Sequence, residues 1–126
     1  MDDKDLYERG LKLRIDMFGR ETVDKRMNAF GDFGKPLQHI INAYAYGDVW
    51  QRSALAPAVK SLAMVAMMAA AGHPNELRVH LKGALKNGCT PEQIQEVLLL
   101  FTMYCGIPAA NEAHRIAADV LREEGR

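Results

Sequence analysis

The five prolines of the chain all stand near the start of a helical pattern, and this placement constrains the fold more than any other feature. Proline lacks a backbone N–H and has a fixed φ of about −65°, so it suits the first turn of an α-helix and interrupts one elsewhere. Apolar residues follow at helical spacing, and no window alternates convincingly with period two. The sequence therefore predicts an all-α protein, with helices opening near Pro36, Pro57, Pro74, Pro91 and Pro108.

Glycines and polar caps mark where the predicted helices end. The first helix should stop at Gly19, and Gly88 should provide a left-handed C-cap. Thr90 and Gln93 flank a proline with the spacing of a capping box. We expect six or seven helices, at residues 4–18, 22–28, 36–47, 57–71, 74–87, 91–104 and from about 108 to the charged tail, with 47–55 as a connection.

Length and composition favour one domain spanning 1–126. The 16 basic and 16 acidic side chains cancel without a basic block, which disfavours nucleic acids and anionic membranes as partners. The acidic, polar N-terminal residues do not resemble a signal peptide, and the longest uncharged stretch, 97–111, is too short to span a bilayer. Cys89 and Cys105 form no CxxC pair. We expect a soluble, cytoplasmic protein without a disulfide framework.

Two predicted helices are apolar nearly all round. Residues 61–71 and 97–104 contain no charged side chain. A helix without a polar face must be buried on every side, and a domain this small can bury one such helix more readily than two. Subunit association would cover the second helix, so we predict a homo-oligomer.

Glu76 and His80 stand four residues apart in a stretch with a helical pattern and should project from one face. A carboxylate can orient an imidazole and raise its pKa, so this pair is a candidate acid/base device. The alternative is a helix-surface pair with no chemistry.

A metal site is a further alternative at the same place. His73, Glu76 and His80 could gather on one helix face. Against this, His73 precedes Pro74 at the helix entrance, and no fourth ligand is evident. We therefore predict no metal.

Four strings in order resemble the carboxymuconolactone decarboxylase family, within the wider alkylhydroperoxidase-D-like superfamily. They are YAYGDVWQR (44–52), ELRVH (76–80), KNGCTPEQIQEVLL (86–99) and YCGIPAANEA (104–113), and Gly10, Gly19, Val23 and Asp24 extend the similarity toward the N-terminus. The resemblance implies a small orthogonal helical bundle of the alkylhydroperoxidase-D-like type that associates as trimers or hexamers.

The redox branch of this superfamily resembles C-x-x-C-x-x-x-H. With its histidine aligned on His80, the two thiol positions fall on His73 and Glu76, so both cysteines are missing. Peroxide reduction needs a low-pKa thiolate and a resolving thiol. Neither Cys89 nor Cys105 reproduces that arrangement, so we expect packing roles for them and no peroxidase activity.

The decarboxylase branch implies a set of candidate site residues. It typically shows the Glu76/His80 segment, a W-x-R segment represented here by Trp50 and Arg52, and a basic residue early in the following helix, here Lys60.

One position departs from the branch's pattern. Many decarboxylase-like members carry His or Gln four positions after the acidic residue of the E-V-L-L string, whereas Leu100 follows Glu96 at that spacing here. This difference bears on the identity of the substrate more than on the fold.

The resemblance implies cofactor-independent decarboxylation of 4-carboxymuconolactone, or a similar small carboxylated lactone, to the enol-lactone and carbon dioxide. The pathway would be protocatechuate/β-ketoadipate aromatic degradation. No cofactor is needed, because electrons from the departing carboxylate delocalise toward the lactone carbonyl. Arg52 and Lys60 are expected to bind the dianionic substrate, and His80, oriented by its carboxylate partner, to donate a proton to carbon. Trp50 and Tyr104 would form an apolar wall.

Each assignment has a structural alternative. His80 also fits a structural histidine, Trp50 and Tyr104 fit core or interface aromatics, and Arg52 and Lys60 fit surface charges. Two other functions stay open. One is different chemistry on this fold, such as lactone hydrolysis or a residual redox role. The other is a non-enzymatic oligomeric scaffold or binding protein, for which the departure in the E-V-L-L string is the main hint.

Overall fold

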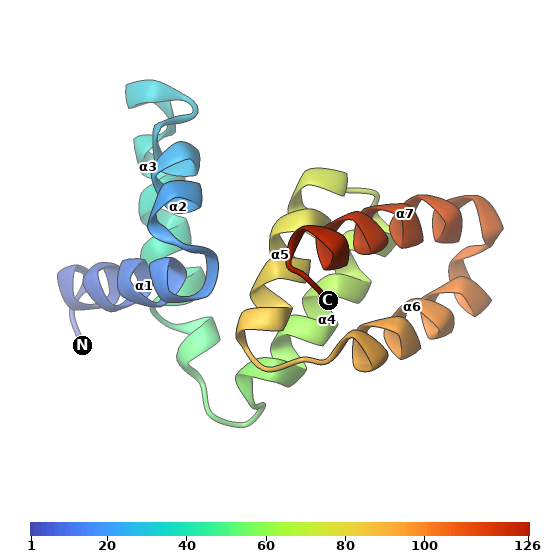
Figure 1. Ribbon diagram of the computed structural model, residues 1–126. Coiled ribbons are helices and arrows are strands. Elements are labelled where there is room, and N and C mark those ends of the chain that lie inside the picture. Colours follow the sequence, from blue (N-terminus) through green and yellow to red (C-terminus); the bar gives the residue numbers. More distant parts are fainter. The chain divides into compact units, whose positions relative to one another are not determined.

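The computed structural model describes residues 1–126 and contains seven α-helices and no strand, which confirms the predicted all-α fold. The chain divides into two compact units, Met1–Leu55 and Ala56–Arg126 (Figure 1). The single domain predicted over 1–126 stays a prediction. The first unit holds α1 (Asp3–Phe18), α2 (Arg20–Asn28) and α3 (Lys35–Ile40), and the second holds α4 (Pro57–Ala71), α5 (Pro74–Lys86), α6 (Pro91–Cys105) and α7 (Ile107–Glu123).

In the first unit, α1 packs closely against a π-helical turn, η2 (Ile41–Tyr46), that follows α3. Two glycines permit the close approach. A Cβ on Gly10 would overlap the carbonyl oxygen of Asn42, and a Cβ on Gly47 would overlap the backbone of α1. Arg9 fixes the end of the turn, since its Nε donates to the carbonyl oxygen of Gly47 at 2.6 Å. The backbone contact between α1 and η2 therefore depends on glycine at both positions.

The helix predicted over 36–47 changes type part-way. Its α-helical part ends at Ile40, and η2 continues it with wider turns. The apolar pattern could not separate the two, because six residues are too few to distinguish their periods. Two short 3₁₀ turns, η1 (Gly31–Gly34) and η3 (Val49–Gln51), complete this unit. π-Helical turns such as η2 are rare in proteins, and those that occur are often found at functional sites.

The second unit is built around a hydrophobic core to which all four of its helices contribute. Val65 on α4, Leu81 on α5, Leu98 on α6 and Val120 on α7 are each at most 2% exposed. Burying one such side chain contributes about 1.5–3 kcal/mol relative to leaving it in water. This core therefore fixes the four helices that carry Lys60 and the other candidate residues of this unit.

The predicted helix ends agree closely with the structure. Thr90 Oγ1 accepts a hydrogen bond from the backbone N–H of Gln93 at 3.1 Å, and Gln93 Oε1 accepts one from the Thr90 N–H at 2.9 Å, which confirms the capping box. Gly88 has a φ of +94° after α5, as expected. The packing role expected for Cys105 was wrong, because this cysteine is exposed at the end of α6.

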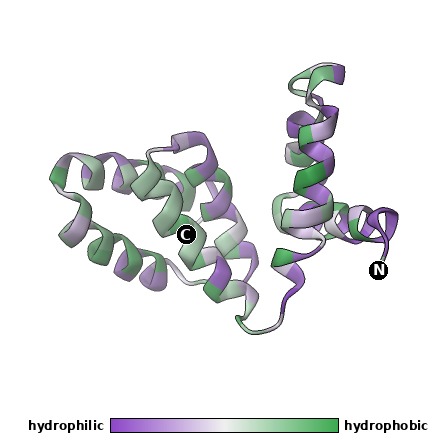
Figure 2. Cartoon of the chain, turned by 180° about the vertical axis from the view of Figure 1, so that it is seen from behind, coloured by the Kyte–Doolittle hydropathy of each residue, from purple (hydrophilic) through white to green (hydrophobic).

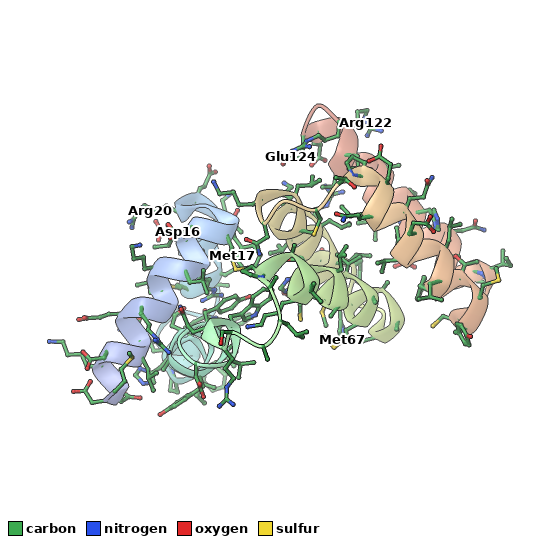
Figure 3. All side chains as sticks on the ribbon, turned by 90° about the horizontal axis from the view of Figure 1, so that it is seen from below. Asp16, Met17, Arg20, Met67, Arg122 and Glu124 are labelled. Carbon is green, nitrogen blue, oxygen red and sulfur yellow. The ribbon has the colours of Figure 1, made fainter.

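One side of α6 is apolar and is not covered by the other helices of its unit. Leu99, Leu100, Met103 and Tyr104 are 49, 63, 74 and 83% exposed, and much of the helix is coloured hydrophobic in Figure 2. On α4, Met67 is 51% exposed and projects from the helix (Figure 3). The other helices of the second unit thus cover only part of each of these two apolar helices. No helix combines the length and apolar character needed to cross a membrane.

Candidate functional site

The predicted site residues occur in both units, and the environment of each can be described within its own unit. Two lie in the connection that ends the first unit, and four lie on the helices of the second. These are Trp50 in η3 and Arg52 just after it, then Lys60 on α4, Glu76 and His80 on α5, and Tyr104 on α6.

His80 lies on the side of α5 that turns toward the core, and Glu76 lies one turn earlier. The buried Leu77 and Leu81 each follow a member of the pair by one position. His80 is 6% exposed and its Nδ1 atom is buried, while Glu76 is half-buried one turn earlier. The burial of His80 contradicts a solvent-facing surface pair. The imidazole is therefore shielded from bulk water, whereas the carboxylate is shielded only in part.

Lys60 is half-buried near the start of α4, which packs against α5. The adjacent Ser61 is fully buried, and its Oγ accepts a hydrogen bond from Nδ2 of Asn87 at 3.0 Å. Cys89 Sγ donates to the carbonyl oxygen of Ala58 at 3.3 Å. These two bonds tie the start of α4 to the end of α5. The lysine and the buried histidine therefore stand on neighbouring helices whose register is fixed.

The two positions of interest on α6 both face outward. Tyr104 is 83% exposed and Leu100 is 63% exposed. They stand four residues apart, so they share one face of the helix. Tyr104 is consequently not a core aromatic of its unit.

Trp50 is half-buried and ends a series of aromatic contacts. Its ring stacks on that of Tyr46, with centroids 5.8 Å apart and planes 8° from parallel. Phe18 meets Tyr46 edge to face at 5.7 Å and 89°. Offset-stacked and edge-to-face arrangements are the favoured geometries of aromatic pairs. Sequence reasoning did not assign a role to Tyr46, although its spacing of four residues from Trp50 was a usable signal.

Arg52 is paired with an acidic residue of its own loop. Its Nε donates to Asp48 Oδ1 at 3.3 Å and its Nη2 to Asp48 Oδ2 at 3.2 Å. The Arg52 side chain is 70% exposed and that of Asp48 is 40% exposed. Gln51, which stands between Trp50 and Arg52, donates from Nε2 to the carbonyl oxygen of Tyr46 at 3.1 Å and so ties the loop to η2. The fork that was predicted to bind a substrate carboxylate already binds a carboxylate here.

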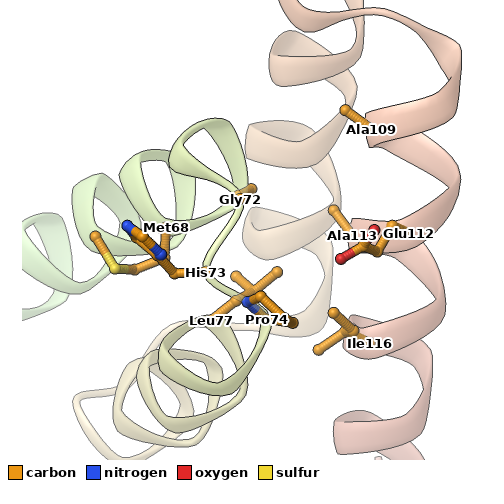
Figure 4. A pocket seen from close by; sticks show the side chains of 10 residues that line it. Met68, Gly72, His73, Pro74, Leu77, Ala109, Glu112, Ala113 and Ile116 are labelled. Atoms are coloured by element: carbon orange, nitrogen blue, oxygen red, sulfur yellow. The ribbon is translucent and has the colours of Figure 1, made fainter.

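A pocket of the second unit lies between the α4–α5 turn and α7 (Figure 4). Its lining is mostly apolar, with Leu77, Ala113 and Ile116 among it, and its two ionisable side chains are His73 and Glu112. None of the six predicted site residues lines this pocket, so it is not the site that the sequence indicated.

Neither a metal cluster nor a redox thiol site is formed by the residues that were considered for them. The chain brings no three His, Cys, Asp or Glu side chains together in an arrangement that could hold a metal ion. Both cysteines are free, and burial raises the pKa of the Cys89 thiol, which disfavours the thiolate. A peroxidatic cysteine needs the opposite shift.

Comparison with known proteins identifies the family. The sequence model of the carboxymuconolactone decarboxylase family matches residues 35–119, a segment that contains all six candidate residues. The chain belongs to the carboxymuconolactone decarboxylase family. This confirms the resemblance predicted from the four sequence strings.

Two relatives show what members of the family do. The chain is 34% identical over 125 residues to 4-carboxymuconolactone decarboxylase from Acinetobacter baylyi, and the match covers 99% of this chain and 93% of the relative. It is 35% identical over 118 residues to nitrosuccinic acid decarboxylase from Metarhizium robertsii, and this match covers 94% of this chain and 82% of the relative. Both are decarboxylases, and this member of the carboxymuconolactone decarboxylase family is accordingly a carboxy-lyase.

Proposed function

We propose that the protein removes carbon dioxide from 4-carboxymuconolactone, or a similar small carboxylated lactone, to give the enol-lactone of protocatechuate/β-ketoadipate degradation in the cytoplasm. Identity of 34% to a 4-carboxymuconolactone decarboxylase over nearly the whole chain supports this substrate class. The observation that carries the proposal is the burial of His80, 6% exposed, one helical turn from the half-buried Glu76.

The reaction itself makes modest demands on the protein. When carbon dioxide leaves, the electron pair of the broken C–C bond delocalises into the conjugated lactone carbonyl, and a proton then reaches carbon. The substrate is its own electron sink, so the proposal includes no cofactor. The protein must bind a compact dianion, stabilise the charge that grows on the lactone oxygen, and deliver one proton.

Arg52 and Lys60 are proposed to bind the two negative charges. The guanidinium offers a planar fork that matches a carboxylate, and its present contact with both oxygens of Asp48 shows the geometry it can adopt. Lys60 supplies a compact charge from a half-buried position. Neither cation exchanges protons in the reaction, because their role is electrostatic.

His80 is proposed as the proton donor and Glu76 as the group that orients it. A carboxylate one helical turn away can orient the imidazole ring, and a protonated imidazole can deliver a proton to the carbon of the dienolate. The buried position of His80 limits exchange of that proton with water.

Trp50 and Tyr104 are proposed as apolar walls. Trp50 is held by stacking on Tyr46, which makes it a rigid surface. Tyr104 is almost fully exposed in one chain and needs a covering partner to exclude water. Exclusion of water strengthens the electrostatic interactions that the reaction uses.

A nitro acid such as nitrosuccinate is a second candidate substrate. The 35% identity to a nitrosuccinic acid decarboxylase favours it, as does Leu100, which stands where many decarboxylase-like members are expected to have His or Gln. A nitro group on the carbon that loses carbon dioxide accepts the electron pair as a nitronate. The same anion-binding residues and the same proton donor would then serve a different electron sink.

The decisive experiment measures both substrates in parallel. Loss of the lactone is followed by ultraviolet absorbance together with carbon dioxide release, and nitrosuccinate is assayed by carbon dioxide release. We expect turnover of the lactone and a loss of about 10²–10⁴-fold in kcat for His80→Ala, the range typical of a general acid.

His114→Ala is the matched control. His114 is half-buried on α7, and its Nδ1 lies 2.8 Å from the carbonyl oxygen of Ala110 on the same helix, so its loss should leave turnover unchanged. Unaltered kcat in a folded His80→Ala variant would reject the proposed donor. Turnover of nitrosuccinate alone would reject the lactone assignment.

We further propose that the protein works as a homo-oligomer. The exposed apolar side of α6, with Leu100, Met103 and Tyr104 each more than 60% exposed, supports this. The family resemblance favours a trimer or hexamer.

A further inference from the structure

Arg14 is a buried cation in the first unit. It lies on α1 and is 5% exposed. Its Nη1 donates to Gln38 Oε1 at 2.7 Å and to Asn42 Oδ1 at 3.1 Å, and both amides are themselves buried. Gln38 belongs to α3 and Asn42 to the π-helical turn η2. The guanidinium therefore joins α1 to both parts of the helical segment that leads to the Trp50 loop.

The same guanidinium also contacts the aromatic series. Its carbon lies 5.9 Å from the centroid of the Tyr46 ring, within the range of a cation–π interaction. Tyr46 is 7% exposed and stacks on Trp50. Tyr46 thus has few other positions open to it, and its ring fixes the plane against which Trp50 rests.

A long apolar side chain could fill the space of Arg14 without the desolvation cost of a buried charge. Position 14 instead holds a guanidinium group with several directed N–H donors. These donors constrain the orientation of its partners as well as their distance. The π-helical turn η2 strengthens this constraint on orientation. It contains both Asn42, whose side-chain oxygen accepts from Arg14, and Tyr46, its last residue.

We propose that Arg14 is a positioning residue for the substrate site: acting through Tyr46, it holds the Trp50 ring in the orientation that forms one wall of that site. The inference rests on the proposed function for the role of Trp50 toward substrate. Arg14 itself touches no substrate. Its removal should loosen the wall while the acid/base pair on α5 stays intact.

The test compares Arg14→Met, Arg14→Lys and Lys12→Met. Trp50 is the only tryptophan of the chain, so its fluorescence reports on the wall alone. We expect Arg14→Met to shift the emission of Trp50 and to raise its acrylamide quenching constant about twofold. With substrate, KM should rise about tenfold while kcat changes less than threefold. Arg14→Lys should restore part of both effects. Lys12→Met, which removes an exposed cation from the same helix, should change neither.

A purely structural role gives a different result. It would lower the melting temperature and the fraction of active enzyme, with KM and the Trp50 quenching constant unchanged in the folded protein, and that outcome overturns the proposal. If Arg14→Met does not fold, Tyr46→Leu replaces it and should raise the quenching of Trp50 in the same way. If the parent enzyme does not turn over the lactone, the proposed function fails, whereas the quenching comparison still tests the link from Arg14 to Trp50.

Discussion

Arg52 donates two hydrogen bonds to the carboxylate of Asp48, from Nε to Oδ1 at 3.3 Å and from Nη2 to Oδ2 at 3.2 Å. Both side chains are substantially exposed, 70% for the arginine and 40% for the aspartate. Exposed ion pairs of this kind contribute only about 0–1 kcal/mol, because water screens the charges and the side chains lose freedom. A substrate carboxylate can therefore take the place of Asp48 at small cost.

Asp48→Asn should lower KM for a dianionic substrate by about two- to fivefold, which corresponds to the free energy of the exposed pair. The amide no longer competes with the substrate for the arginine, and kcat should stay the same. Arg52→Ala should raise KM at least tenfold. Asp16→Asn, which removes the carboxylate of another exposed i,i+4 pair, is the control and should leave KM unchanged. Steady-state kinetics at fixed ionic strength measure all three. A higher KM in Asp48→Asn would mean that Asp48 orients Arg52 rather than competes for it.

The fold could be predicted from the sequence because its signals are local. Thr90, Gln93 and Pro91 specify a helix start through contacts within one turn, and the structure has that capping box. The π-helical turn at 41–46 was not predictable in this way. It depends on the approach of α1 through Gly10, a contact between residues more than thirty positions apart.

Gly10→Ala should destabilise the protein by at least about 2 kcal/mol. Helix propensity alone predicts the opposite, a gain of about 1 kcal/mol. The added Cβ would overlap the carbonyl oxygen of Asn42, however, and relieving the overlap must move α1 away from η2. Urea unfolding followed by circular dichroism measures the difference. Glu8→Ala, at an exposed position of the same helix, should change stability by less than about 0.5 kcal/mol. A stabilised Gly10→Ala protein would contradict the close packing of α1 on η2.

Thr90→Ala should cost about 1 kcal/mol of stability, the usual value for loss of an N-cap side chain. The variant removes the acceptor of the Gln93 N–H and leaves the reciprocal bond to Gln93 Oε1 in place. Thr90→Ser keeps the hydroxyl and should retain most of the stability. Chemical denaturation midpoints with equal m-values measure the effect, and equal stability of the Ala and Ser variants would show that the hydroxyl contributes nothing.

The stabilising contribution of Asp3 should depend on pH. Hydrogen bonds from His39 and then Tyr44 lower the pKa of this carboxyl below its ordinary value of 3.8. A lowered folded-state pKa means that the stabilisation is fully present above pH 3.8 and is lost as the pH falls through the folded-state pKa. The urea midpoint of Asp3→Asn should therefore lie below that of the parent at pH 5 and approach it at pH 2.5. Asp5→Asn, in the same first turn, controls for the helix dipole. An equal difference at both pH values would contradict the linkage.

The candidate site was less predictable than the fold, for a physical reason. The burial of His80 follows from the apolar face of α5 and could be foreseen from the helical pattern. The partners of Trp50 and Arg52 were harder to predict. Tyr46 and Asp48 each stand four residues earlier, but that spacing predicts a contact only within a regular helix, and residues 47–55 were expected to form a connection. The family motifs predicted which residues form the site and left their partners open.

Met103→Glu should dissociate the proposed homo-oligomer. Met103 is 74% exposed on the apolar side of α6, and a carboxylate placed within an interface there would lose its hydration without gaining a partner. Size-exclusion chromatography with light scattering should give a trimer or hexamer for the parent and a smaller species for the variant. Gln95→Glu, which adds the same charge at an exposed polar position of α6, should leave the assembly intact.

Met103→Glu should also reduce decarboxylation, because Tyr104 follows Met103 directly and is proposed to need a covering partner. A monomeric parent with full activity would contradict both the oligomer and the assignment of Tyr104 as a wall.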